Sequence, residues 1–172
     1  KSILILGAGA SYDFSHLRNT GGQHISPLTN ELFEAPYVRP DLLQKYPEAG
    51  TLASALYEKV RNQSKSFEDA LLQYQNGATE GSDRLKNIEA LRHYLQEYFA
   101  TVSGKGRSYP INNFRALVDK INTYSPEITV VSFNYDYLFE EACTSQKWGQ
   151  MTDYIAGKIK VIKPHGSANW VY

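Results

Sequence analysis

Three short apolar runs in this chain have the pattern of buried β-strands. Residues 3–6 form a run that ends in glycine, which is typical of a central parallel strand. Residues 128–133 are apolar and β-branched, and residues 158–163 alternate charged with apolar side chains. The last run therefore predicts a strand near a sheet edge.

Apolar residues recur at helical spacing over two long stretches, 85–102 and 114–124. We expect residues 51–125 to be mostly helical. Loops that contain glycine or proline interrupt them at 76–83 and 103–110.

The remaining pattern predicts three shorter helices and one irregular segment. One helix should begin near Ser11, and a second should run from Ser26 to Glu34 with Pro27 in its first turn. A third is expected at 136–145. Three prolines predict an irregular chain over residues 35–50.

This order of elements predicts the α/β class, with a Rossmann-like parallel sheet. We expect a single domain over residues 1–172, with a helical insertion at about 35–125. A sheet of three strands is small. We therefore expect the chain to be the N-terminal part of a domain whose further strands would follow Tyr172.

Charge and cysteine content limit the kinds of partner and cofactor that we expect this chain to bind. Eighteen basic and eighteen acidic residues cancel, which disfavours nucleic acid and anionic membranes. The single cysteine, Cys143, cannot form an internal disulfide or a cysteine-cluster zinc site. No apolar run approaches the ~20 residues of a membrane span. We expect a cytoplasmic protein that uses no metal.

The first predicted strand is followed by a glycine-rich turn. It consists of Gly7, Ala8, Gly9, Ala10 and Ser11. Such a turn lets backbone N–H groups face an anion. It matches only part of the dinucleotide fingerprint, because position 12 is Tyr and no acidic residue ends a second strand. A conventional hydride-transfer enzyme is therefore disfavoured, and a tight turn without a ligand explains the glycines equally well.

Polar residues also follow the other two strands. Asn134 and Asp136 come after residues 128–133, and His165 and Ser167 come after residues 158–163. Asp136 is explained equally well as a helix cap, whereas Asn134 lies two residues too early for that role. His165 lies beside Gly166, where a ligand can approach the chain closely. Ligands of open α/β sheets bind where parallel strands end, so these residues are candidates for one site.

Together the three motifs resemble the sirtuin-like superfamily. Its pattern is a glycine-alanine-glycine-x-serine turn, then Asn-x-Asp after a strand, then His-Gly-Ser. The longer strings at 133–140 and 163–170, and the segment 26–33, are more similar to bacterial sirtuin-like NAD hydrolases than to protein deacetylases. Those hydrolases are often found in antiphage defence proteins. The deacetylase segment Gly-Ile-Pro-x-Phe-Arg and the four zinc cysteines are absent from this chain.

The resemblance implies cleavage of the bond between nicotinamide and ribose in NAD. Asn134 would orient the ribose hydroxyls or the attacking water, and His165 would act as general base. Asp136 would contact the nicotinamide amide. Residues 7–11 would bind the pyrophosphate, and Ser167 would complete the NAD site.

Two other functions stay open at this point. The first is a transferase that uses the same NAD chemistry, either a protein deacylase or an ADP-ribosyl transferase. The second is a non-catalytic nucleotide-sensing module of a larger signalling protein. The resemblance also implies control by a fused regulatory domain or by assembly into a homo-oligomer, because unrestrained NAD loss would kill the host.

Overall fold

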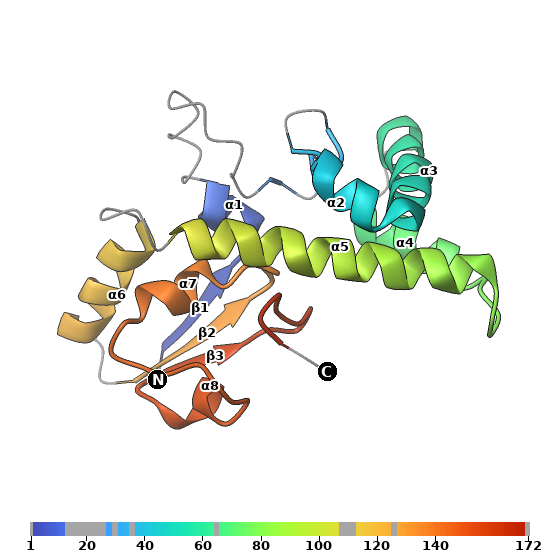
Figure 1. The fold of residues 1–172 in the computed structure, drawn as a ribbon. Helices are drawn as coiled ribbons and strands as arrows, with labels where there is room; N and C mark the ends of the chain where they lie inside the picture. The colour runs from blue at the N-terminus through green and yellow to red at the C-terminus, as the bar shows by residue number, and fades with distance from the viewer. Residues whose placement is uncertain are drawn as a thin grey trace. The chain divides into compact units, whose positions relative to one another are not determined.

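The chain folds into a mixed α/β structure in the computed structural model (Figure 1). The structure describes residues 2–12, 27–28, 31–34, 37–63, 66–106, 113–124 and 127–170. In these ranges the elements follow in the order β1 Ser2–Leu6, α1 Ala8–Tyr12, α2 Pro40–Lys45, α3 Pro47–Gln63, α4 Phe67–Gln75, α5 Asp83–Gly106, α6 Asn113–Tyr124, β2 Ile128–Ser132, α7 Leu138–Ala142, α8 Asp153–Ala156 and β3 Ile159–Ile162.

The described strands form one parallel sheet in the order β1-β2-β3. Leu4 of β1 lies opposite Val130 of β2, which lies opposite Val161 of β3. The expected strands at 128–133 and 158–163 are confirmed, each with slightly narrower bounds. The expectation that β1 is central is wrong for the described sheet, in which β2 is central and β1 lies at an edge.

Only one face of this sheet is covered by the described residues. Alternate positions of the strands, among them Ile128, Val130 and Val161, are buried. The opposite face carries Ile3 and Ile5, with 72% and 67% of their surface exposed. Strands of parallel sheets are ordinarily buried on both faces and are therefore apolar throughout. The run at 3–6 has this composition because Ile3 and Ile5 are apolar even though they lie on the exposed face.

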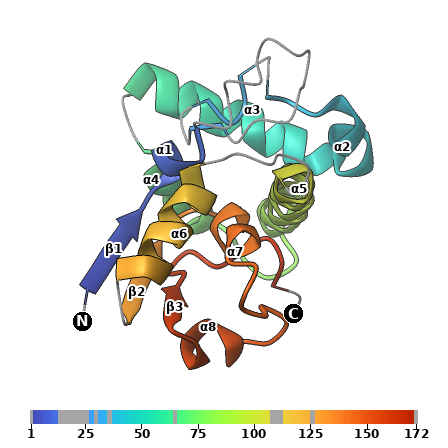
Figure 2. The same ribbon diagram turned by 90° about the vertical axis from the view of Figure 1, so that its left-hand side faces the viewer.

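The chain divides into two structural units, 1–26 with 99–172, and 27–98. The first unit holds the sheet. Within it α6 packs against α7 (Figure 2). The rings of Phe114 and Phe139 meet edge to face there, with 5.8 Å between their centroids. The second unit is helical.

The core of the second unit is built from the apolar faces of its helices. Leu56 of α3 and Leu91 of α5 are almost completely buried, and Phe67 of α4 stacks at a tilt on Phe33 with 5.7 Å between ring centroids. The Ser66 hydroxyl accepts a hydrogen bond from the Asp69 N–H and caps α4. The prediction that 51–125 is mostly helical is therefore confirmed for the described residues in that range.

Several predicted boundaries are wrong. Residues 31–34 form turns rather than helix, and Ser26 lies outside the described residues. Residues 35–50 are not irregular throughout, because Pro40 opens α2 and Pro47 opens α3. A proline in the first helical turn loses no hydrogen bond that the helix needs.

The helices at the ends of the predicted strands also differ from expectation. α1 already begins at Ala8, so the glycine-rich turn is itself the start of the helix. α5 continues to Gly106, through part of the loop expected from residue 103 onward. α7 covers only Leu138–Ala142 of the helix expected at 136–145.

Candidate functional site

The segments that follow the three strands are joined by backbone hydrogen bonds at the carboxyl edge of the sheet. The Phe133 N–H donates to the Leu6 carbonyl at 2.9 Å, which joins the end of β1 to the loop after β2. The Ala168 N–H donates to the Tyr135 carbonyl at 2.8 Å, which joins the loops after β2 and β3. The structure therefore brings the segments that carry the three predicted motifs to one edge.

Asn134 and Ser11 meet directly, although 123 positions separate them in the sequence. Ser11 is fully buried, Asn134 is 6% exposed, and the Asn134 Nδ2 donates to the Ser11 Oγ at 2.8 Å. The Asn134 Oδ1 is buried and has no hydrogen-bond partner among the described residues. A hydroxyl can donate or accept, so either orientation of the amide leaves one of its polar atoms unpaired.

An unpaired buried amide atom calls for a physical explanation, because leaving it unsatisfied costs about 1–3 kcal/mol. A ligand that supplies the missing partner removes this penalty when it binds. Asn134 therefore has the geometry of a residue held by Ser11 on one side and available to a ligand on the other.

The glycines of the first motif are not required by packing. A Cβ atom placed at Gly7 or at Gly9 would meet no described atom within 4 Å, and neither residue has a positive φ. The Ala10 N–H donates to the Gly7 carbonyl at 2.8 Å, which closes the first turn of α1. The open space beside the two glycines leaves room for a ligand to approach the backbone.

Asp136 has a clear local role. Its Oδ1 accepts a hydrogen bond from the Leu138 N–H at 3.2 Å, and the residue is buried at the start of α7. The N-cap position of α7 is Tyr137 and has no side-chain cap bond, so Asp136 forms a turn just before the helix and is not its cap. Its contact with a ligand stays a prediction.

His165 lies in a tight turn after β3. The Gly166 N–H donates to the Lys163 carbonyl at 3.0 Å, and Gly166 has a φ of 83°, which favours glycine. The exposed imidazole contacts the rings of Phe133 and Tyr135, with centroid distances of 5.4 and 6.0 Å. These rings flank Asn134 in the sequence, so His165 lies against the loop that carries Asn134.

Ser167 lies on the same turn, half-buried near a group of aromatic side chains. Tyr154 packs edge to face against Trp170 at 5.7 Å, and its hydroxyl bonds the Asn169 side chain. Burial raises the pKa of the Tyr154 hydroxyl, and the hydrogen bond to Asn169 opposes that rise. The half-buried Trp170 thus packs against Tyr154.

Sequence reasoning missed a buried ion pair beneath the two loops. The Lys163 Nζ lies 3.0 Å from the Glu140 Oε1 and also donates to the Asp136 carbonyl. Burial raises the pKa of the Glu140 carboxyl, and the charge of Lys163 opposes this rise. The signal was present, because Lys163 continues the buried alternation of Ile159 and Val161 just after β3, and a lysine at a buried position needs a partner.

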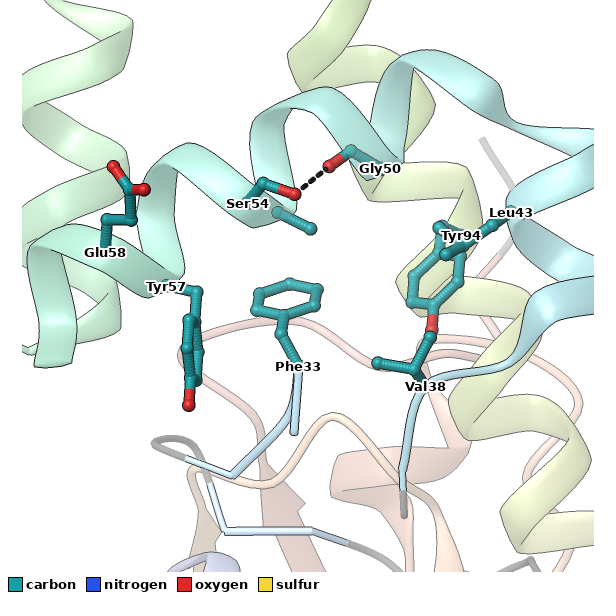
Figure 3. A pocket seen from close by; sticks show the side chains of 9 residues that line it. Phe33, Val38, Leu43, Gly50, Ser54, Tyr57, Glu58 and Tyr94 are labelled. Carbon is teal, nitrogen blue, oxygen red and sulfur yellow. Dashed lines mark hydrogen bonds between the residues drawn. The ribbon is translucent and has the colours of Figure 1, made fainter. Parts of the chain in front are cut away.

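A separate cavity of about 300 Å³ lies in the helical unit (Figure 3). It is lined mainly by apolar and aromatic side chains, including Phe33, Tyr57 and Tyr94. The Tyr94 hydroxyl accepts from the Arg39 N–H, and the Tyr57 hydroxyl accepts from Arg61. Glu58 is the charged side chain of the lining.

Metal-binding clusters and membrane-spanning helices are both absent from the described residues. No group of three His, Cys, Asp or Glu side chains in that part of the chain is placed to hold a metal ion. Among the same residues, the helices all lack the combination of length and apolar character that a membrane crossing requires.

Comparison of the chain with protein-family models, curated proteins and solved structures found no match.

Proposed function

We propose that this chain binds NAD at the carboxyl edge of a Rossmann-like sheet and hydrolyses it to nicotinamide and ADP-ribose. The observation that carries the proposal is the buried amide of Asn134, which is held by Ser11 and has one polar atom without a partner among the described residues. A ribose hydroxyl or an ordered water can supply that partner. The order of the three motifs and their meeting at one edge add support.

In the reaction the C1′–N bond of the nicotinamide riboside breaks, and its electron pair leaves with nicotinamide. Positive charge develops on the ribose, and a water oxygen bonds to C1′ while losing a proton. Asn134 orients the ribose hydroxyls or this water, and His165 accepts the proton directly or through a ribose hydroxyl. The imidazole is exposed, and imidazole is the side chain best suited to accept and release a proton near neutral pH.

The other residues of the site bind rather than react. The open space beside Gly7 and Gly9 accommodates the pyrophosphate, next to Ala8, Ala10 and Ser11. Asp136 contacts the nicotinamide amide, and Ser167 belongs to the same binding site.

One observation favours a second function, a nucleotide-binding module without turnover. No hydrogen bond orients the His165 imidazole in the described part of the chain, where its contacts are with the rings of Phe133 and Tyr135. A catalytic base is usually held by a further group, although such bonds often tighten only when substrate binds.

The test is nicotinamide release from NAD by this chain, with the Asn134→Ala and His165→Ala variants measured alongside. We expect release with free ADP-ribose as the co-product, and at least a ~100-fold loss in each variant. Asn122→Ala is the matched control, because Asn122 is an exposed amide on α6 in the same unit. Thermal unfolding of each variant separates loss of chemistry from loss of fold.

The other outcomes assign the site differently. NAD binding that Asn134→Ala weakens, with no nicotinamide release, makes the chain a binding module. Release that requires an acyl-lysine peptide makes it a deacylase. If the chain neither binds NAD nor releases nicotinamide, the proposal is overturned.

A further inference from the structure

Lys163 is the most completely buried charged side chain near the candidate site. Its side chain is 0% exposed, and that of its partner Glu140 is 2% exposed. The Lys163 Nζ bonds two groups from different elements, the Glu140 carboxylate on α7 and the Asp136 backbone carbonyl in the loop after β2. One ammonium group therefore joins the end of β3, this loop and α7.

Stability alone does not account for such an arrangement. Removing two charges from water is expensive, and apolar residues of similar volume often stabilise a protein as well or better. The bond to the Asp136 carbonyl is different, because a methionine in place of Lys163 cannot make it.

The position of this bond ties it to the candidate site. His165 lies between two attachments to the loop at 134–136, the Lys163 side chain on Asp136 and the Ala168 N–H on Tyr135. The Gly166 N–H closes the intervening turn onto the Lys163 carbonyl. The turn that carries His165 is thus fixed at both ends to the loop that carries Asn134.

We propose that Lys163 is a positioning residue, whose bond to the Asp136 carbonyl holds the loop that carries Asn134 and the turn that carries His165 in a fixed mutual arrangement. Glu140 is the counterion that makes the buried ammonium tolerable. The catalytic consequence rests on the proposed function, whereas the arrangement of the two loops does not.

The decisive variant is the double change Lys163→Met/Glu140→Leu, which removes both buried charges together. Lys163→Met alone leaves Glu140 buried without its counterion, so a strong loss of stability is expected. The double variant should regain most of the wild-type urea midpoint. Its Ala168 amide should nevertheless exchange with solvent at least ~10-fold faster, measured by NMR where global stability is restored.

Two further variants isolate the bond to the loop. Glu140→Gln keeps Lys163 and its bond to the Asp136 carbonyl but leaves the buried ammonium without its counterion, so a loss of stability is expected here too. Compared under conditions of equal global stability, its Ala168 exchange should stay close to the wild-type rate. Lys45→Met removes one partner of an exposed ion pair of the helical unit, leaves the bond from the Tyr46 hydroxyl to Glu97 in place, and serves as the control. It should change neither the urea midpoint nor Ala168 exchange appreciably.

The activity readout separates positioning from binding. We expect the double variant to lower kcat for nicotinamide release by at least ~10-fold with little change in KM, because misplaced reacting groups affect the chemical step most. A double variant with wild-type Ala168 exchange and wild-type kcat overturns the inference. So does Glu140→Gln if, at equal global stability, its Ala168 amide exchanges as fast as that of the double variant. If the wild-type chain releases no nicotinamide, the proposed function fails and the exchange rates alone decide the role of Lys163.

Discussion

At the scale of single residues, the pairing of Asn134 with Ser11 gives the first prediction. Ser11→Ala removes the oxygen that accepts from the Asn134 Nδ2, and both residues are buried. We expect the free energy of unfolding to fall by about 1–3 kcal/mol, because a buried amide loses its partner. NAD affinity should fall as well, since nothing then fixes the amide. Urea unfolding and NAD titration measure the two effects.

Ser54→Ala is the control for this change. The Ser54 hydroxyl is exposed and donates to the Gly50 carbonyl within its own helix, so its loss should alter stability by no more than about 0.5 kcal/mol. Equal effects of the two substitutions on NAD affinity would contradict a specific role for Ser11.

Cys143 gives a second prediction at this scale. Burial raises the pKa of its thiol to about 12, and the nearby Glu140 contributes to the rise. At pH 8 only about one thiol in ten thousand is then ionised, so a thiol-reactive dye should not label the native chain. Full labelling in urea is the positive control, and rapid stoichiometric labelling of the native chain would contradict the burial.

The same shift makes stability depend on pH. The unfolded thiol loses its proton near pH 9, while the folded thiol keeps it up to about pH 12. The unfolded state is therefore favoured progressively as the pH rises through this window, and stability falls. Cys143→Ala should make the decline between pH 9 and about 10.5 shallower, which urea unfolding at each pH can measure.

At the scale of elements, the burial of the helices predicts where substitutions matter. Leu56 of α3 is completely buried, whereas Leu72 of α4 is 54% exposed. Leu56→Ala should lower the free energy of unfolding by about 2–5 kcal/mol, because it leaves a cavity in the core of the helical unit. Leu72→Ala should change it by less than about 0.5 kcal/mol. Similar values for the two in urea unfolding would contradict the assigned core.

The helices also show what local sequence can and cannot predict. Periodicity predicted α5, but Gly104 and the residues around it indicated a loop from residue 103. In the structure the buried Ser103 hydroxyl accepts a hydrogen bond from the Tyr137 N–H. This bond to a distant segment helps the last turn of the helix persist, and no local pattern contains it.

Prolines gave an error of the same kind. Pro40 and Pro47 suggested irregular chain, yet each opens a helix, where its fixed φ is compatible with the first turn. The strands were easier to predict, because β2 combines β-branched residues with burial on one face.

The sequence predicted which residues lie at the candidate site, but not the side-chain contacts that they make with one another. Motifs at strand ends predicted that Asn134 and His165 would lie at one edge of a parallel sheet. The partnership of Asn134 with Ser11 depends on how a helix packs across 123 positions of sequence. The Lys163–Glu140 pair forms because both side chains are buried. Charged residues are usually exposed, so their residue types alone do not predict this burial.

At the scale of the whole molecule, the main departure from a packed α/β structure is the sheet face that the described residues leave uncovered. Ile3 and Ile5 of β1 are more than half exposed, and Ile162 of β3 is 48% exposed. Adjacent exposed side chains of this kind form an apolar patch that solvent-sensitive dyes can bind. In this chain of zero formal net charge, charge repulsion does little to oppose association through the patch.

The double variant Ile3→Thr/Ile5→Thr tests this patch. Threonine is compatible with a strand, and both side chains lie on the exposed face, so the urea midpoint should hardly change. The fluorescence of an anilinonaphthalene sulfonate dye should fall, because the dye loses its apolar surface. Leu72→Thr removes one exposed leucine from a helix of the other unit and should leave most of the fluorescence.

If the double variant binds the dye as well as the wild type, the dye-binding surface lies elsewhere. If its urea midpoint drops sharply, the two isoleucines are packed against other residues rather than exposed.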